Sequence, residues 1–148
     1  MLFGALERRA HAIIIADAAV AGMPLTHVNY EFEELTVYTA AEAVGRNCRF
    51  LQGEETNMDD VRKISEAVKK GERITVRLLN YRKDGQKFWN LLTVAPVKLP
   101  DGTVAKFIGV QVDVSDPLES VNRVIFEFND LVYTHVADPL ATAYTNVV

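Results

Sequence analysis

The sequence of 148 residues has very little cysteine and no long apolar run. Its only cysteine, Cys48, cannot form a disulfide within the chain, and a metal site built from cysteines is excluded. A transmembrane helix needs about 20 consecutive apolar residues, and no stretch approaches that length. The start of the chain carries Glu7, Arg8 and Arg9 after only a few apolar side chains, which is not the order of a secretory signal. We therefore expect no membrane span and a reducing, cytoplasmic setting.

The chain also has fewer basic than acidic residues. The 16 lysines and arginines face 20 acidic residues, which gives a formal net charge of −4. This balance argues against nucleic acid or an anionic membrane as the main partner. Hydrophobic residues make up 49% and charged residues 24% of the chain, as in a globular domain. The length suits one domain with a sizeable core, and we expect no metal site.

Five segments show the patterns of β-strands. Residues 12–16 (AIIIA) form a short apolar run typical of a buried strand, and residues 25–29 predict a second strand. Three longer segments alternate apolar and polar side chains, and each is joined to the next by a turn that contains Asp-Gly, which tolerates positive φ. These longer strands are predicted at residues 72–81, 87–98 and 103–114.

Helices are predicted between the second and third strands. Thr39 followed by Glu42 is a capping-box pattern, and Thr56 followed by Asp59 repeats it. Apolar residues follow Thr56 at helical spacing, so a helix should run from there to about Gly71. Two strands, several short helices and three strands favour an α+β fold, in which helices cover one face of a five-stranded antiparallel sheet. This arrangement resembles the PAS fold.

The two ends of the chain follow a different pattern. Residues 1–11 suggest a short N-terminal helical flank. Residues 117–133 have apolar side chains at three- and four-residue steps, which predicts an amphipathic helix, and a tail follows it. The sequence therefore divides into a flank at 1–11, a domain at 12–115 and a helix with tail at 116–148. Either helix can cap the sheet, pack against a second copy in a homodimer or pack against a partner, and these alternatives remain open.

Primary amides interrupt the apolar face of the three long strands. Because side chains alternate along a strand, Asn80, Asn90 and Gln111 each fall in an inward row of apolar residues. A buried amide without a partner costs a few kcal/mol, so three of them call for a polar object. A flat heterocycle with carbonyl and N–H groups would satisfy them, and Gly109 would let a ring approach the backbone. The alternative is that these amides bond to one another or to turns.

Residues 45–53, GRNCRFLQG, carry the most specific pattern. This stretch resembles the signature of LOV domains, the flavin-binding subclass of PAS domains. Residues 80–97 (NYRKDGQKFWNLLTVAPV) and 107–115 (FIGVQVDVS) resemble the last three strands of phototropin-type LOV domains. The resemblance covers about residues 12–115. A lone cysteine is usually a small buried hydrophobe, but this match favours a photochemical role for Cys48.

The resemblance implies a role for each residue that matches the family pattern. Cys48 is the photoreactive thiol that adds reversibly to the flavin under blue light. Asn80 and Asn90 bond to the pyrimidine edge of the flavin. Gln111 bonds near its carbonyl 4 and nitrogen 5, and its reorientation relays the signal to the flanking helices.

The same resemblance places the rest of the cofactor. Asn47 and Gln52 contact the ribityl chain, and Arg49 pairs with the terminal phosphate of FMN. The expected walls around the ring are apolar or glycine: Ile14, Leu51, Ile64, Leu92, Val94 and Gly109.

The sequence departs from the LOV pattern at one position that usually binds the phosphate of FMN. Many LOV domains carry a second phosphate-binding arginine where this chain has Ser65, in the run Lys63-Ile64-Ser65. Arg62, one turn earlier, and Lys69, one turn later, are the two substitutes on the same predicted helix, but neither places a planar fork at position 65. We expect weaker retention of FMN, with riboflavin or FAD as alternative occupants.

Three functions remain open at this stage. The first is a blue-light photoreceptor domain, a sensory module rather than an enzyme. The second is a flavin-dependent redox enzyme, which is disfavoured because no proton-transfer pair is visible and the three histidines lie far from Cys48 in sequence. The third is a light-insensitive flavin-binding or thiol redox PAS interaction module.

Overall fold

The computed structural model describes residues 11–114, and these form an α+β fold around one antiparallel sheet. The sheet has five strands in the order β2-β1-β5-β4-β3. The strand bounds are Ala12–Asp17 for β1, Leu25–Val28 for β2, Ile74–Tyr81 for β3, Lys87–Lys98 for β4 and Val104–Asp113 for β5. The predicted fold class and the five strands are confirmed, with strand ends within two residues of those expected.

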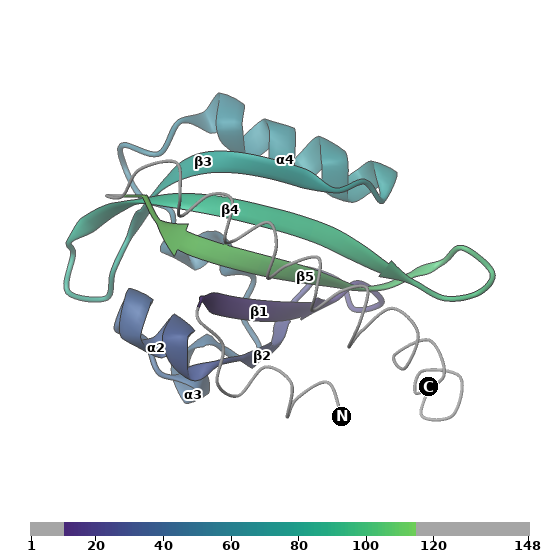
Figure 1. Ribbon diagram of the computed structural model, residues 1–148, viewed down its shortest axis with the longest axis horizontal. Coiled ribbons are helices and arrows are strands. Elements are labelled where there is room, and N and C mark those ends of the chain that lie inside the picture. The colour runs from purple at the N-terminus through teal and green to yellow at the C-terminus, as the bar shows by residue number, and fades with distance from the viewer. Residues whose placement is uncertain (1–10, 115–148) are drawn as a thin grey trace.

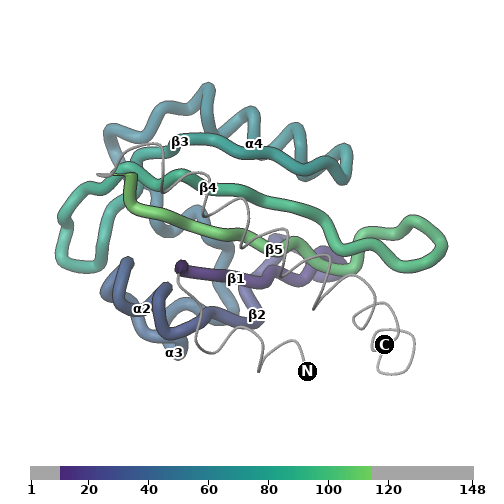
Figure 2. The backbone as a smooth tube through the Cα atoms, in the orientation of Figure 1, coloured from purple at the N-terminus to yellow at the C-terminus, as the bar shows by residue number. Residues whose placement is uncertain are grey.

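The helices lie between β2 and β3 in the chain. They are α2 at Tyr30–Thr36, α3 at Ala40–Ala43, the 3-10 helix η1 at Cys48–Leu51 and α4 at Met58–Lys70. In Figure 1, α4 runs alongside β3 and β4, whereas α2 and α3 lie beside β1 and β2. The backbone tube in Figure 2 shows the β3–β4 and β4–β5 hairpins at opposite ends of the domain.

One of the two predicted helix starts differs from its expected place. The predicted capping box at Thr39 is present, but α4 begins one residue later than expected, with Asn57 as its N-cap. Thr56 is buried instead, and its hydroxyl donates to Leu79 O at 2.7 Å and accepts from Gly53 N at 3.0 Å. The hydroxyl therefore ties the chain before α4 to β3 and is not free to cap the helix.

Strand β2 ends at Val28 because Asn29 serves the next helix. Asn29 Oδ1 accepts from Phe32 N at 3.0 Å, which caps α2, and from Ile13 N at 2.8 Å. Its Nδ2 donates to His11 O at 2.9 Å. One buried amide thus joins the start of α2 to strand β1.

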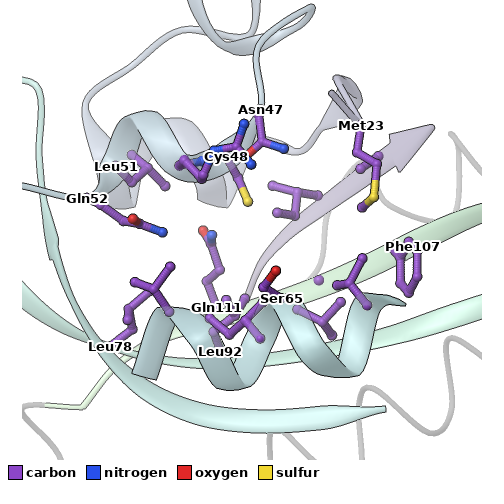
Figure 3. A pocket seen from close by; sticks show the side chains of 18 of the residues that line it. Met23, Asn47, Cys48, Leu51, Gln52, Ser65, Leu78, Leu92, Phe107 and Gln111 are labelled. Atoms are coloured by element: carbon purple, nitrogen blue, oxygen red, sulfur yellow. Dashed lines mark hydrogen bonds between the residues drawn. The ribbon is translucent and has the colours of Figure 1, made fainter. Parts of the chain in front are cut away.

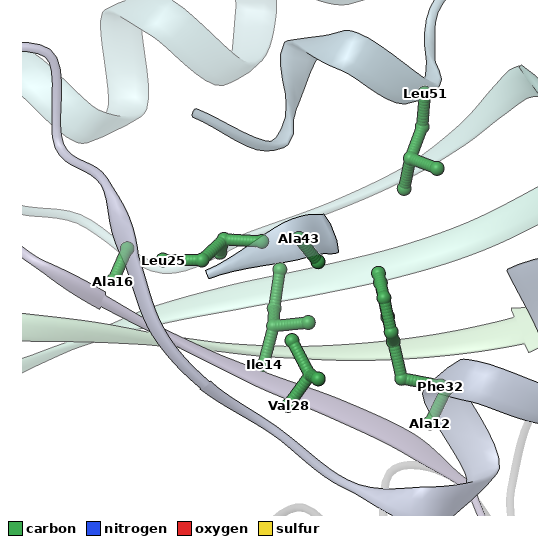
Figure 4. Close-up of a cluster of buried hydrophobic side chains, with 8 residues drawn as sticks. All are labelled: Ala12, Ile14, Ala16, Leu25, Val28, Phe32, Ala43 and Leu51. Carbon is green, nitrogen blue, oxygen red and sulfur yellow. The ribbon is translucent and has the colours of Figure 1, made fainter. Parts of the chain in front are cut away.

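Apolar side chains line both faces of the sheet. On the helix-covered face, Phe32 of α2 and Leu51 of η1 pack with Ile14 of β1, as Figure 4 shows. On the opposite face, Ile13, Ile108 and their neighbours form a second buried cluster. Since both faces of β1 and β5 are buried, the central strands hold a rigid platform for side chains that point toward the helices.

The predicted terminal helices at 1–11 and 117–133 lie outside the described residues, apart from position 11. Among residues 11–114, no helix is long and apolar enough to cross a membrane.

Val37 offers a test of the local backbone. It is the C-cap of α2 with φ 67° and ψ −1°, a left-handed conformation that is unfavourable for a β-branched residue. Val37→Asn should raise the free energy of unfolding by about 1 kcal/mol, because asparagine tolerates this region better. Urea unfolding measures the change.

Val44 provides the matched control. It is also an exposed valine at a helix C-cap, but its φ is −63° and its ψ is 135°. Val44→Asn should bring no gain in stability. Equal gains for both substitutions would show that the left-handed backbone at Val37 is not the cause.

Candidate functional site

A cavity lies between the helix-covered face of the sheet and the helices η1 and α4. Its wall is mostly apolar, with a few polar side chains on opposite sides, as Figure 3 shows. Its lining residues come from β1, the following loop, η1, α4 and the three long strands: Ile14, Ala16, Met23, Asn47, Cys48, Arg49, Leu51, Gln52, Val61, Ile64, Ser65, Val68, Leu78, Asn80, Leu92, Val94, Phe107, Gly109 and Gln111.

Cys48 reaches the cavity because it is the first residue of η1. Asn47 caps this helix: its Oδ1 accepts from Arg49 N at 2.9 Å, and its Nδ2 donates to Gly22 O at 2.7 Å. The cap fixes the start of η1 against the loop after β1. Figure 3 shows the sulfur of Cys48 directed into the cavity, toward Gln111 on β5.

The Cys48 thiol is neutral at pH 7. Burial raises its pKa above the ordinary value, and the positive charge of Arg49 and a backbone hydrogen bond oppose this only in part. A neutral thiol is a poor nucleophile. Cys48 therefore requires activation by a partner in the cavity before it can form a bond.

The three predicted amides are buried on the sheet side of the site. In the observed register Asn90 faces Leu78, and Gln111 faces Leu92. The amides are thus diagonal neighbours on adjacent strands. Asn80 and Gln111 line the cavity, whereas Asn90 does not and reaches it through Asn80, donating to Asn80 Oδ1 at 2.9 Å.

The amides do not satisfy one another completely. Among the described residues, Asn90 Oδ1 and Gln111 Oε1 are buried without a hydrogen-bond partner. The sequence left open the alternative that the amides bond only to one another or to turns. That alternative explains the Asn80–Asn90 pair and the bond from Asn80 Nδ2 to Leu79 O. It does not explain the two oxygens without partners. An unsatisfied buried acceptor costs about 1–3 kcal/mol, which indicates a ligand that donates hydrogen bonds.

Gly109 makes room for a flat ring. A Cβ at this position would lie 2.9 Å from Ile14 Cγ1 and 3.6 Å from Leu92 Cδ1, so any larger residue would fill the cavity floor. Ile14 pairs with Gly109 across β1 and β5, and Val94 pairs with it across β4 and β5. The residues present fit a planar, partly polar heterocycle between apolar walls.

The polar groups of η1 and α4 lie on the other side of the cavity. Arg49 and Gln52 line it, as predicted, and Ser65 faces it from α4. Arg62 does not: its Nη1 lies 2.6 Å from Asp59 Oδ1, and its side chain is 63% exposed. The structure thus brings together every predicted site residue except Arg62 and the indirectly linked Asn90.

Besides Ser65, six lining residues were not among the predicted site residues: Ala16, Met23, Val61, Val68, Leu78 and Phe107. Val61 and Val68 lie on the same face of α4 as Ile64, three residues before it and four after it, so helical spacing would have identified them. Met23 lies in the loop after β1 with φ 47°, and no local pattern indicates its place.

Among the described residues, no group of three or more histidine, cysteine, aspartate or glutamate side chains is placed to hold a metal ion.

Comparison with family models places the described residues in one family. The model of the PAS domain matches residues 11–116. A second model, of the MlaA lipoprotein, matches residues 114–148, of which the structure describes only Val114.

Individual relatives narrow the assignment. Phototropin-2 of rice, Oryza sativa subsp. japonica, is 45% identical over 127 residues, which cover 86% of this chain. The chain spans only 14% of the length of that phototropin.

Solved structures of LOV domains are also similar to this chain. The LOV domain of the Erythrobacter litoralis EL346 blue-light-activated histidine kinase matches with a TM-score of 0.71 and 39% identity, over 74% of this chain and 100% of that one. A light-oxygen-voltage domain studied with a flavin analogue matches with a TM-score of 0.70 and 38% identity, over 82% and 87% of the two chains. The fold, the cavity and these relatives together show that the chain belongs to the LOV domains of the PAS superfamily.

Proposed function

We propose that this LOV domain binds a flavin, FMN in the first place, and that Cys48 adds to it reversibly under blue light. The observation that carries the proposal is the arrangement of one cavity: a half-buried thiol on η1 lies across from the unpartnered amide oxygen of Gln111 on β5. The phototropin and the blue-light kinase among the relatives support a response to blue light, and the flavin-analogue structure supports a flavin.

The chain's residues would hold the flavin as the family pattern implies. Asn80, Asn90 and Gln111 offer donors and acceptors to the pyrimidine edge, and Gly109 admits the ring. Asn47, Gln52 and Arg49 take the ribityl chain and phosphate. Apolar walls exclude water and give the ring a defined slot, and they are formed by Ile14, Leu51, Ile64, Leu92 and Val94.

The proposed reaction needs no second reagent. A flavin excited by blue light supplies an electron-poor carbon 4a and a basic nitrogen 5. With a flavin bound, Cys48 would offer its sulfur to that carbon and its thiol proton to that nitrogen, so the S–H bond and the π bond between carbon 4a and nitrogen 5 would be exchanged for one C–S and one N–H bond. Because the thiol is protonated in the dark, the proton is present when it is needed. Reversal of the same steps restores the dark state.

Gln111 is the proposed relay. Protonation of nitrogen 5 would turn an acceptor into a donor, so the Gln111 carboxamide would present its oxygen where it had presented its nitrogen. Gln111 lies two residues before the end of β5. Arg82 also bonds to Asp113 at 2.8 Å, which ties that strand end to the β3–β4 hairpin. A change at Gln111 would thus reach the point where the chain leaves the sheet.

We propose that the signal leaves through the flanking segments at 1–11 and 116–148, by capping the sheet differently or by homodimerisation. The PAS match ends at residue 116 and the MlaA lipoprotein match begins at 114, which supports a domain boundary there and a separate role for the C-terminal segment.

The absorption spectrum tests the adduct. The wild type should be yellow, should bleach under blue light and should recover in the dark. Cys48→Ala should stay yellow and fluorescent without bleaching, because the bond-forming sulfur is gone. Met23→Leu is the matched control, since Met23 is the other sulfur-containing side chain of the cavity lining, and it should bleach like the wild type.

Other outcomes would separate the competing functions. Bleaching with unchanged recovery in Cys48→Ala contradicts the adduct. A yellow wild type that does not bleach indicates a light-insensitive flavoprotein or a redox enzyme. A colourless protein that takes up no flavin indicates an interaction module or thiol sensor.

The relay predicts a selective loss in Gln111→Leu. The variant should still bleach, because Cys48 is intact, but light should no longer change hydrogen exchange of the β5 amides. Exchange measured in darkness and under blue light gives the comparison with the wild type. A light-induced change of wild-type size in the variant would assign the relay to another residue.

Because serine stands where many LOV domains have an arginine, introducing an arginine at position 65 should raise the affinity for FMN. Ser65 lines the cavity, so Ser65→Arg should tighten FMN binding by about ten- to a hundredfold through charge-assisted bonds worth roughly 1.5–3 kcal/mol, and should leave riboflavin binding unchanged. Ser65→Gln adds a long neutral side chain and serves as the control. Fluorescence titration of the unloaded protein measures both flavins. An equal gain for riboflavin, or for the glutamine variant, would refute a phosphate contact at this position.

A further inference from the structure

A second groove lies where α4 ends and the β4–β5 hairpin begins, and it is distinct from the slot described above. Its volume is about 430 Å³, within the range of small-molecule sites. Its floor is apolar and is formed by Met23, Val68, Val104 and Phe107. Three of these side chains, Met23, Val68 and Phe107, also line the flavin cavity, so the two spaces share one wall.

The rim of the groove is positively charged. Lys69 and Lys70 reach it from the end of α4, and Lys98 reaches it from the end of β4. Among the described residues, other lysines have acidic partners, such as Lys83 with Glu42, but none of these three forms an ion pair within residues 11–114. Among residues 11–114, three ammonium groups without an acidic partner thus line the same groove as these apolar side chains.

The carboxylate of the adjoining hairpin accepts a hydrogen bond within its own turn and forms no ion pair with these lysines among the described residues. Asp101 Oδ1 accepts a hydrogen bond from Thr103 N at 2.9 Å, which closes the β4–β5 turn. The glycine at the end of α4 also shapes the groove. A Cβ on Gly71 would lie 3.2 Å from Val104 Cγ2 and 3.7 Å from Lys98 Cε, so the glycine leaves space for both to line the groove.

Helix electrostatics explain only part of the rim. Lysines in the last turn of a helix favourably offset its exposed carbonyl groups, and this accounts for Lys69 and Lys70. It does not account for Lys98, which comes from a strand, nor for the apolar floor beneath the three ammonium groups. Lysines act as compact point charges and suit a small anionic group.

We propose that this groove binds the carboxylate of a free, medium-chain fatty acid, with its alkyl chain on the apolar floor and its carboxylate among Lys69, Lys70 and Lys98. Exposed ion pairs alone contribute little, so the affinity must come from joint use of charge and apolar burial. The binding is non-covalent and does not require the light reaction. The proposal therefore stands or fails independently of the adduct at Cys48.

Calorimetric titration with decanoate, below the concentration at which it forms micelles, tests the charged rim. The full 148-residue chain should bind decanoate saturably, and the variant carrying Lys69→Gln, Lys70→Gln and Lys98→Gln should bind at least tenfold more weakly. Lys63→Gln removes a lysine of the same helix that does not line the groove, and it should bind like the wild type. Unchanged circular dichroism spectra verify that the variants are folded.

Two further arms test the apolar floor. Decanol has the same alkyl chain without the charge and should bind at least tenfold more weakly than decanoate. Val104→Gln makes the floor polar without touching the flavin cavity, and it should weaken decanoate binding several-fold. The proposal is overturned by an absence of saturable decanoate binding, by equal binding in the triple variant, by equal binding of decanol, or by displacement of decanoate by equimolar inorganic phosphate.

Discussion

The constraint on which the structure depends is the burial of primary amides on an otherwise apolar sheet face. Asn90 donates one hydrogen bond of 2.9 Å to Asn80. Asn90 Oδ1 and Gln111 Oε1 nevertheless have no hydrogen-bond partner among the described residues. Such an arrangement is unfavourable in the isolated protein and favourable around a polar ring. The antiparallel register of β3, β4 and β5 aligns these groups diagonally, and Gly109 keeps the floor open.

Regular patterns made much of this predictable. Alternation along the strands predicted the inward rows, Asp-Gly pairs predicted the hairpins, and the segment around Cys48 indicated the LOV family. The remainder depends on tertiary contacts. Thr56 looks like an N-cap in sequence, but its hydroxyl bonds to β3, so Asn57 takes that role. Arg62 shares a helix with Ser65, but it pairs with Asp59 on the exposed surface.

The thiol and the ring-binding groups have complementary tasks. Burial raises the pKa of the Cys48 thiol, so in the proposed reaction the thiol would be unreactive in the dark and would keep the proton that it transfers. Asn47 fixes η1 through Gly22 and Arg49, so the thiol does not depend on a flexible loop for its position. The groove proposed to bind a fatty acid shares Met23, Val68 and Phe107 with the cavity proposed to bind the flavin, so the two sites are in direct contact.

Infrared difference spectroscopy of the S–H stretch tests the central claim most directly. Cys48 is the only cysteine, so the band has a single source. We predict that the band disappears on illumination with blue light and returns at the same rate as the yellow absorption in the dark. A band that persists while the flavin bleaches would contradict bond formation at this sulfur, whatever the geometry of the cavity.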